Sequence, residues 1–244
     1  MRLPAQRTDV SSAVTPDFFL ITCEHGGNRI PREYRALFDG YESLLITHRA
    51  YDAGALRIAR DLSSALHAPL CASTISRLLI DLNRSITHPR LFSEISRAAP
   101  VAIRQEIRQR YYAPYRNTVE QWVEQSIADG RRAVHLSCHS FAPEFDGVRR
   151  DADIGLLYDP ARSGEAALCR HWRAAINARI PALKIRMNYP YAGKSDGLTS
   201  SLRRRFAPER YLGIELEINQ RHVFENAVHW RGIRNAVINA LRRL

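Results

Sequence analysis

A short apolar run near the amino end limits the folds open to this chain more than any other feature of its sequence. Residues 18–23 read Phe-Phe-Leu-Ile-Thr-Cys, and the run stops at Glu24-His25-Gly26-Gly27. A continuous apolar run of this length, ending in glycines, is typical of a strand buried on both faces, as in a parallel sheet. The sequence therefore predicts a buried strand that leads into a polar, glycine-containing loop.

Further strands and helices are expected to alternate along the chain. We expect strands at 70–81, 133–137, 154–158 and 211–219, and helices at 51–67, 101–128 (interrupted near Pro114), 165–179 and 225–244. This alternation indicates a three-layer α/β fold, in which helices cover both faces of a mostly parallel sheet. Ligands of such folds bind at the carboxyl ends of the strands, so polar residues at those ends are the candidate site.

The composition fits one domain of ordinary size. Of the 244 residues, 45% are hydrophobic and 25% are charged, which supports a real core and excludes disordered and fibrous classes. We expect an N-terminal tail at 1–17 and a single domain at 18–244. No stretch approaches the roughly 18 to 20 apolar residues of a membrane span. The N-terminal segment lacks the apolar centre of a signal peptide, so a cytoplasmic protein is expected.

The net charge of +11 raises the question of nucleic-acid binding, because basic proteins bind phosphates by releasing counterions. Only two of the 36 basic residues are lysines, Lys184 and Lys194, and the arginines are spread along the whole chain. This scatter favours solvated helix faces over a basic binding face, so no nucleic-acid partner is expected. Arginine also binds carboxylates through its planar guanidinium, which favours a small carboxylate ligand. The oligomeric state stays open.

Two histidines follow expected strands and have small neighbours. His25 precedes two glycines, and His139 precedes Ser140. One histidine in such a place is more often a hydrogen-bonded loop residue than a ligand. Two in the same setting, with carboxylates at other strand ends, indicate a metal site with an open water position. The other seven histidines lack this setting, and we expect them to be structural or surface residues.

The segment Asp81-Leu82-Asn83-Arg84 ends the strand expected at 70–81. Its aspartate would orient a metal-binding imidazole, and its Asn-Arg pair would donate hydrogen bonds to a substrate carboxylate. An Asp-Asn turn with a solvated arginine is an equally good interpretation.

Glu215 and Glu217 alternate with Ile214, Leu216 and Ile218, so a strand there places both carboxylates on one face. Two acids within a core strand are costly unless they face solvent, arginine or a catalytic water. A strand at the exposed edge of the sheet is the alternative.

Six segments, taken in order, resemble the N-formylglutamate amidohydrolase family. They are 23–31 (CEHGGNRIP), 51–55 (YDAGA), 76–84 (SRLLIDLNR), 139–141 (HSF), 188–191 (NYPY) and 217–219 (EIN). The family has a zinc-exopeptidase (phosphorylase/hydrolase)-like α/β fold, related to that of the metallocarboxypeptidases. The resemblance implies zinc-dependent hydrolysis of the amide bond of an N-acyl amino acid, first of all N-formylglutamate, giving glutamate and formate.

The resemblance also implies roles for individual residues. His25 and His139 would be zinc ligands, and Asn83 and Arg84 would hold the carboxylate of the substrate. Glu217 aligns better than Glu215 with the glutamate that serves as general base, which takes a proton from the attacking water and delivers it to the leaving amine.

One position departs from the related metallocarboxypeptidase pattern. A glutamate ligand is expected three residues after the first histidine, but that residue is Asn28, a poor zinc ligand. Asp52 is expected to replace it, ahead of Glu24. Asp81 would hold a zinc-binding imidazole from behind, and Arg77 or the metal would stabilise the oxyanion.

Two alternatives remain open. A related zinc hydrolase could act on another N-acyl amino acid or on a peptide C-terminus, because the acyl pocket depends on loops at 85–100 and 143–152. A non-catalytic module could instead use its arginines to bind an acidic ligand or nucleic acid. The missing glutamate at position 28 is the support for this second alternative.

Overall fold

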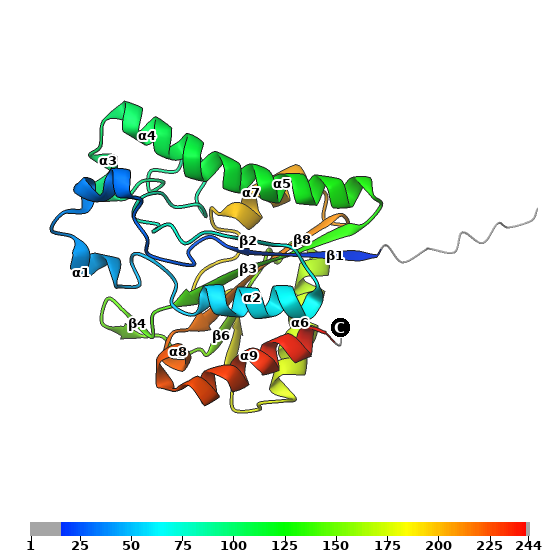
Figure 1. Cartoon of the computed structure of the whole chain (residues 1–244). Helices are drawn as coiled ribbons and strands as arrows, with labels where there is room; N and C mark the ends of the chain where they lie inside the picture. The colour runs from blue at the N-terminus through cyan, green and yellow to red at the C-terminus, as the bar shows by residue number, and fades with distance from the viewer. Residues whose placement is uncertain (1–15, 243–244) are drawn as a thin grey trace, which may run out of the picture.

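The computed structural model describes residues 16–242, which form a six-stranded sheet between two layers of helices (Figure 1). The strands lie in the order β2-β1-β3-β8-β6-β7. Their bounds are β1 (Asp17–Cys23), β2 (Leu70–Ala72), β3 (Arg132–Phe141), β6 (Ile154–Leu157), β7 (Ile185–Met187) and β8 (Tyr211–Asn219). Neighbouring strands are parallel except for β6 and β8. This confirms the predicted three-layer α/β fold with a mostly parallel, mixed sheet.

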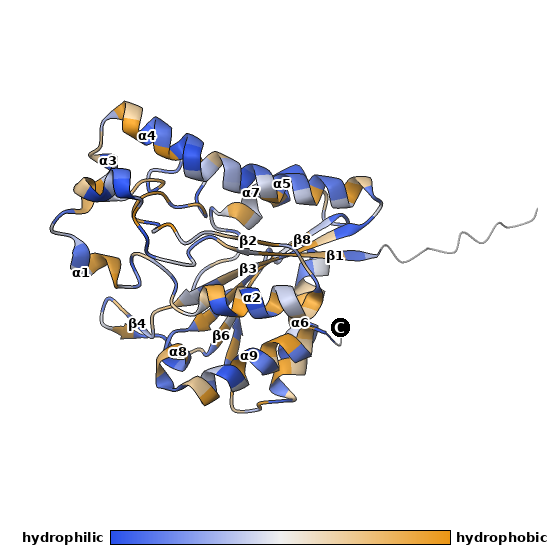
Figure 2. Ribbon diagram, in the orientation of Figure 1, coloured by the Kyte–Doolittle hydropathy of each residue, from blue (hydrophilic) through white to orange (hydrophobic). Residues whose placement is uncertain are grey.

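Helices cover both faces of the sheet, and each layer has its own core. One layer contains α2 (Ala55–Leu66), α6 (Ser163–Asn177) and α9 (Ala227–Leu241), and the other contains α4 (Val101–Ile107), α5 (Ala113–Ala128) and α7 (Leu198–Arg205). Successive residues of a strand point to opposite faces, so Leu20 packs in the α5 layer and Ile21 in the α2 layer. Figure 2 shows orange, apolar strands and much hydrophilic blue on α4 and α5.

The long helix predicted at 101–128 is bulged but not broken. A π-helical turn, η2 (Arg108–Tyr112), joins α4 to α5. Pro114 follows this turn, and because proline has no N–H to donate, a helical hydrogen bond is missing there. The predicted interruption is therefore a widened turn just before the proline.

The strand predicted at 70–81 is wrong beyond its first three residues. The chain leaves the sheet there and follows the loop after β1, as the backbone bond from Arg29 N to Thr74 O (2.9 Å) shows. The apolar residues that suggested a strand, among them Leu79 and Ile80, are buried in the α5 layer as an irregular segment. An apolar run shows burial, but it does not distinguish a buried strand from a buried loop.

The strand predicted at 133–137 is longer, because β3 continues to Phe141. His139 therefore lies in the strand and not in a loop after it. Several short elements were not predicted. They are η1 (Arg32–Phe38), α1 (Glu42–Leu45), α3 (Glu94–Arg97), α7, α8 (Arg221–Glu225), β7 and a hairpin of β4 (Glu144–Phe145) and β5 (Val148–Arg149).

Most of the tail predicted at 1–17 lies outside the described residues, and β1 begins at Asp17. The single-domain organisation at 18–244 stays a prediction. Over residues 16–242, no helix is both long and apolar enough to cross a membrane.

Candidate active site

The candidate site lies where one face of β3 and β8 changes from apolar to polar. Near the amino ends, Ala133 and Tyr211 are paired in register and fully buried in the α5 layer. Further along the same face, His139 lies opposite Glu217. The same alternation that builds the core at one end of these strands therefore presents a histidine and a carboxylate at the other.

A cleft of about 820 Å³ opens at these strand ends. Residues from the loops at 85–100 and 143–152 line part of it. The structure brings together in this cleft all eight residues predicted from the sequence to be catalytic, substrate-binding, metal-binding or ligand-orienting: His25, Asp52, Arg77, Asp81, Asn83, Arg84, His139 and Glu217.

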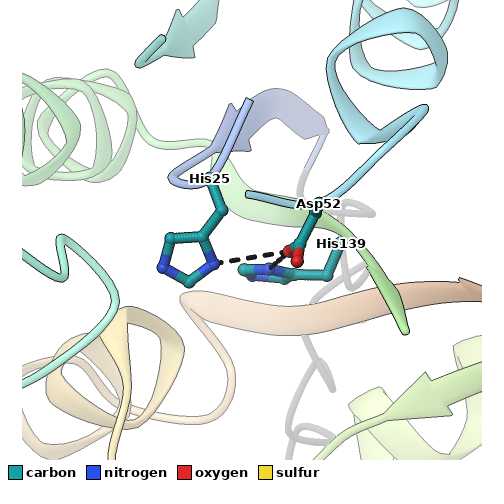
Figure 3. A group of neighbouring side chains, drawn as sticks. All are labelled: His25, Asp52 and His139. Carbon is teal, nitrogen blue, oxygen red and sulfur yellow. Dashed lines mark hydrogen bonds and ion pairs between the residues drawn. The ribbon is translucent and has the colours of Figure 1, made fainter. Parts of the chain in front are cut away.

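His25, Asp52 and His139 converge from three different elements (Figure 3). His25 follows β1, Asp52 precedes α2, and His139 lies in β3. Asp52 Oδ2 is 3.4 Å from His25 Nδ1 and 2.9 Å from His139 Nδ1. All three residues are buried, and a backbone bond from Asp52 N to His25 O (2.9 Å) joins two of the three segments.

A carboxylate holds the other nitrogen of each imidazole. Asp81 Oδ1 lies 2.7 Å from His25 Nε2, and Glu24 Oε2 lies 3.1 Å from His139 Nε2. Because an ionised carboxylate only accepts hydrogen bonds, His25 Nε2–H donates to Asp81. His139 Nε2 also lies 2.8 Å from the Ser137 hydroxyl, which itself donates to Glu24. Each Nδ1 is thereby directed toward Asp52. Metal-binding histidines in proteins usually have such a carboxylate partner.

The surroundings of His25 Nδ1 test whether these residues fit a metal ion. This atom is buried, and the part of the chain that the structure describes offers it no hydrogen-bond partner. Buried polar atoms are rarely left unpaired. Two imidazole nitrogens and one carboxylate oxygen, all within 4.8 Å of one another, are a suitable donor set for a divalent ion such as zinc. The His25, Asp52 and His139 side chains therefore fit a metal ion.

The charges in this cluster shift the pKa values of its members. Burial opposes ionisation of Asp52, but Arg77 and the two histidines outweigh it and hold the pKa of this carboxyl well below its usual range. Burial also opposes protonation of His139, but Asp52 and Glu24 raise its pKa well above the usual value. Without a bound cation, His139 therefore holds a proton that a metal ion would displace.

Asn28, at the position of the expected glutamate ligand, does not point into the cluster. Its Nδ2 donates to Leu45 O at 2.9 Å. Of the two carboxylates considered as replacements, Asp52 lies beside Nδ1 of both histidines, whereas Glu24 lies at Nε2 of His139. The geometry favours Asp52 as the third ligand and gives Glu24 a place behind the imidazole.

Glu215 and Glu217 share a strand face but differ in their contacts. Glu215 Oε1 accepts a hydrogen bond from the Thr199 hydroxyl at 2.6 Å, which ties it to α7. Glu217 Oε2 is buried and has no hydrogen-bond partner among residues 16–242. Burial, together with the charges of Asp52 and Glu215, raises the pKa of Glu217 to about 8, although His139 opposes this. Since proton transfer is best served by a pKa near neutrality, the geometry favours Glu217 as the base.

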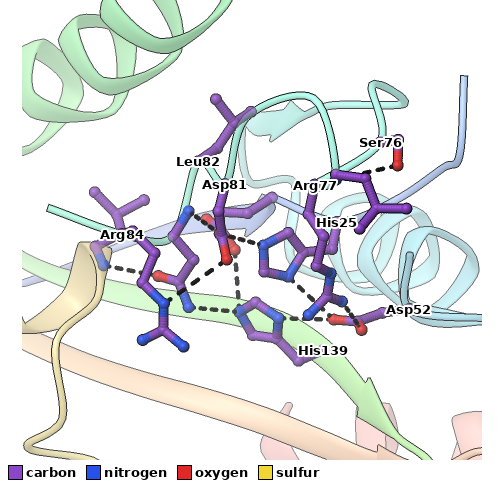
Figure 4. A network of polar contacts seen from close by, with 12 residues as sticks. His25, Asp52, Ser76, Arg77, Asp81, Leu82, Arg84 and His139 are labelled. Atoms are coloured by element: carbon purple, nitrogen blue, oxygen red, sulfur yellow. Dashed lines mark hydrogen bonds and ion pairs between the residues drawn. The ribbon is translucent and has the colours of Figure 1, made fainter. Parts of the chain in front are cut away.

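Arg77 lies beside the cluster and contacts its aspartate (Figure 4). Its Nη2 donates to Asp52 Oδ1, the oxygen other than the one nearest the histidines. About a quarter of the Arg77 side chain is exposed, at 24%. Arg77 therefore orients Asp52 and also faces the cleft.

Asn83 and Arg84 are each fixed by one contact outside the cluster. Asn83 Oδ1 accepts from Leu198 N at 2.7 Å, at the start of α7. Arg84 Nη1 donates to Asp196 O at 2.9 Å. These bonds position both donors at the wall of the cleft.

Some features of the cleft were missed from the sequence. Arg150, beside the β4–β5 hairpin, lies over the rings of Phe145 (4.7 Å) and Tyr191 (5.1 Å). Its loop was expected to shape the acyl pocket, but one arginine among so many does not stand out. The Ser137 hydroxyl donates to Glu24 Oε2 at 2.7 Å, a contact between strands that no local pattern signals.

Solved structures and a family model relate the chain to known proteins. The gene product Atu2144 from Agrobacterium tumefaciens is similar in structure, with 28% identity and a TM-score of 0.79, covering 94% of this chain and 90% of that one. The N-formylglutamate amidohydrolase from Ralstonia eutropha JMP134 shares the fold at 20% identity, with a TM-score of 0.66 and coverage of 94% and 92%. Among curated proteins, none matches. The family model of N-formylglutamate amidohydrolase matches residues 18–224. Since this match spans most of the sequence, the chain belongs to the N-formylglutamate amidohydrolase family.

Proposed function

We propose that this protein hydrolyses the amide bond of an N-acyl amino acid, with N-formylglutamate as the first candidate and glutamate and formate as the products. Membership of the family indicates a hydrolase. The observation that carries the proposal is the convergence of His25 Nδ1, His139 Nδ1 and Asp52 Oδ2 in a cleft that also contains the unpaired carboxylate oxygen of Glu217.

The metal of this proposal is zinc, held by His25, Asp52 and His139. When bound, a zinc ion supplies Lewis acidity, which lowers the pKa of water and polarises a carbonyl oxygen. Asp81 fixes the imidazole of His25 by accepting from Nε2–H at 2.7 Å, and Glu24 pairs with Nε2 of His139 at 3.1 Å. Arg77 holds the second oxygen of Asp52, so the carboxylate is fixed before any ion arrives.

Glu217 would move the proton. Its carboxylate would accept a proton from the attacking water and then donate it to the nitrogen of the leaving amine. Its raised pKa makes both halves of this transfer feasible near neutral pH. Glu215 is left out of this step, because its carboxylate is already bonded to Thr199.

Asn83, Arg84 and Arg77 would bind the substrate. Arg84 and Asn83 are fixed at the wall of the cleft, where their N–H groups would hold the α-carboxylate. Arg77 would donate to the oxyanion that develops on the amide carbonyl, and a donor of this kind contributes roughly 3 kcal/mol. Hydrolysis then proceeds on a substrate that is held at both ends of the scissile bond.

A substrate panel tests this proposal. Zinc-loaded protein is incubated with N-formyl-, N-acetyl- and N-succinyl-amino acids and with a peptide, and the released amine is measured. We expect hydrolysis of N-formylglutamate, its loss with chelator and its return with zinc. Zinc-loaded protein that binds N-formylglutamate without cleaving any member of the panel would favour the non-catalytic alternative. Preference for another acyl group would move the proposal to a related hydrolase.

A further inference from the structure

A second group of two histidines and a glutamate lies outside the cleft, where α8 meets α9. His222 and Glu225 belong to α8, and His229 lies in the first turn of α9. His222 Nδ1 is 2.8 Å from His229 Nε2, and His229 Nε2 is 3.3 Å from Glu225 Oε2. Figure 1 shows that α8 and α9 lie on the opposite side of the sheet from α4 and α5.

The corner between the two helices is fixed by its own contacts. The Asn226 side chain caps α9 by accepting from His229 N at 2.8 Å. Val223 packs tightly against Gly54, because a Cβ added to Gly54 would lie 2.6 Å from Val223 Cγ2. The backbone that presents the three side chains is therefore held in place before any ligand binds.

A buried carboxylate sets the orientation of His222. Asp153 Oδ1 lies 2.6 Å from His222 Nε2, and Asp153 Oδ2 accepts from Lys184 N at 2.7 Å. Because Nε2–H donates to this carboxylate, the lone pair on Nδ1 points at His229. His222 thus has the same kind of support as the imidazoles in the cleft, where Asp81 holds His25.

We propose that His222, Glu225 and His229 form a second binding site, for a divalent transition-metal ion such as zinc. With bonds of about 2.0 to 2.1 Å and tetrahedral angles, ligand atoms lie about 3.3 Å apart. The Glu225–His229 separation already has this value, the two imidazole nitrogens lie closer, at 2.8 Å, and all three ligand atoms lie within 4.8 Å of one another. The ion would replace the proton that His229 Nε2 donates to His222 Nδ1, and that proton would move to His229 Nδ1 or leave to water.

Access to this site differs from access to the cleft. The side chains of Glu225 and His229 are 53% and 32% exposed, so an ion can arrive from solvent and keep water on its free positions. His222, by contrast, is buried and fixed by Asp153. This combination favours a site that ties α8 to α9 and contributes to stability. The inference does not depend on the activity proposed for the cleft.

Counting bound zinc tests the site. Full-length protein is stripped with chelator and titrated with zinc chloride, and bound metal is measured by calorimetry and elemental analysis. We expect two zinc ions per wild-type chain and one in the double variant Glu225→Gln/His229→Gln. His171→Gln is the control: this exposed histidine lies elsewhere on the surface, so the variant should keep both ions. The melting temperature should rise with zinc by more in the wild type than in the double variant.

The outcomes separate the two sites. A wild-type chain that binds one ion, and a double variant that also binds one, would overturn the second site and leave the cleft proposal intact. If the double variant instead binds none, the second site stands and metal binding in the cleft is wrong. Both substituted side chains are partly exposed, so we expect the double variant to fold. Circular dichroism of the variant checks this.

Discussion

The two histidine clusters of this chain use the same parts in different settings. In each, a carboxylate fixes one imidazole from behind: Asp81 holds His25 at 2.7 Å, and Asp153 holds His222 at 2.6 Å. The first cluster is buried throughout and shares its cleft with Glu217, whereas the second lies at a helix corner with two half-exposed ligands. Similar ligand sets can therefore fit an ion in both places, but only the first has a desolvated base beside it.

Glu217→Gln tests this difference between the two clusters most directly, because it removes the base and leaves the metal ligands unchanged. We expect kcat to fall by about 10²- to 10⁴-fold, the usual contribution of a positioned acid or base. Zinc content should not change, since Gln keeps the size of the side chain and His25, Asp52 and His139 are untouched. Parallel assays of turnover and bound zinc measure both effects.

Glu209→Gln is the matched control, because it makes the same substitution at an exposed position outside the cleft. It should turn over like the wild type. Normal turnover by a fully metallated Glu217→Gln protein would rule out Glu217 as the base. The proton transfer would then have to be assigned to another group in the cleft, with Glu215 first.

The same substitution should stabilise the metal-free protein at high pH. The pKa of Glu217 is raised from 4.5 to about 8 in the fold, chiefly by burial. The stability that comes from keeping this group neutral is present below pH 4.5 and is lost as the pH rises through 8. Between pH 4.5 and 8, each pH unit lowers the free energy of unfolding by about 1.4 kcal/mol. Glu217→Gln removes this loss, because Gln does not ionise.

Urea unfolding of chelator-treated wild type and Glu217→Gln at pH 5, 7 and 9 measures this effect. The variant should gain stability relative to the wild type as the pH rises. His139 also loses its proton at high pH, which destabilises the fold in both proteins, so the two proteins are compared at each pH. A difference that stays constant from pH 5 to 9 would show that the pKa of Glu217 is not raised.

Asp81→Asn tests whether the carboxylate behind an imidazole matters for the ion. Removing such a partner lowers metal affinity by about 10- to 100-fold. We expect this loss for zinc in the cleft, measured by competition with a chelator in the Glu225→Gln/His229→Gln background, where only the cleft site remains. Asp153→Asn in the otherwise wild-type chain should weaken the second site instead. Unchanged zinc affinity in Asp81→Asn would mean that Asp81 serves the fold and not the ligand.

Strand ends leave a local signal for the two histidines of the first cluster, whereas Asp52 is expected from the family resemblance. Runs that stop at Glu24-His25 or at Cys138-His139 mark the same edge of a parallel sheet, so residues far apart in sequence could be placed in one site. The fold class follows from the same alternation. The loop after β2 could not be predicted, because its burial gives it the apolar pattern of a strand.

The second cluster could not be predicted from the sequence. His222, Glu225 and His229 have helical spacing, which the sequence displays, but nothing nearby in the chain reveals that Asp153 holds the ring of His222. Without that contact, the sequence predicts only that the two histidines are structural or surface residues. The Glu24 carboxylate behind His139 was missed as a partner for the same reason, since it depends on the register of β1 against β3. Partners of an imidazole that are distant in the sequence can be identified only from the fold.

The smallest expected effect is on substrate selection. We expect it only at the first cluster, because only that cluster lies in the cleft. Arg150 lies over three aromatic rings at the wall of the cleft, at 4.7 Å from Phe145, 5.1 Å from Tyr191 and 5.8 Å from Phe141. A guanidinium held by rings in this way keeps its N–H edge available for a carboxylate. We expect it to bind the side-chain carboxylate of an acidic substrate.

Arg150→Gln should therefore raise KM for N-formylglutamate by about tenfold, since a charged hydrogen bond contributes about 1.5 kcal/mol. KM for N-formylalanine should stay the same, because that substrate has no second carboxylate to lose. Arg149→Gln, one residue earlier and outside the cleft, is the control. Equal changes for both substrates would show that Arg150 shapes the cleft without selecting the substrate. A selective change would assign it to specificity and separate the cleft from the second cluster by function as well as by burial.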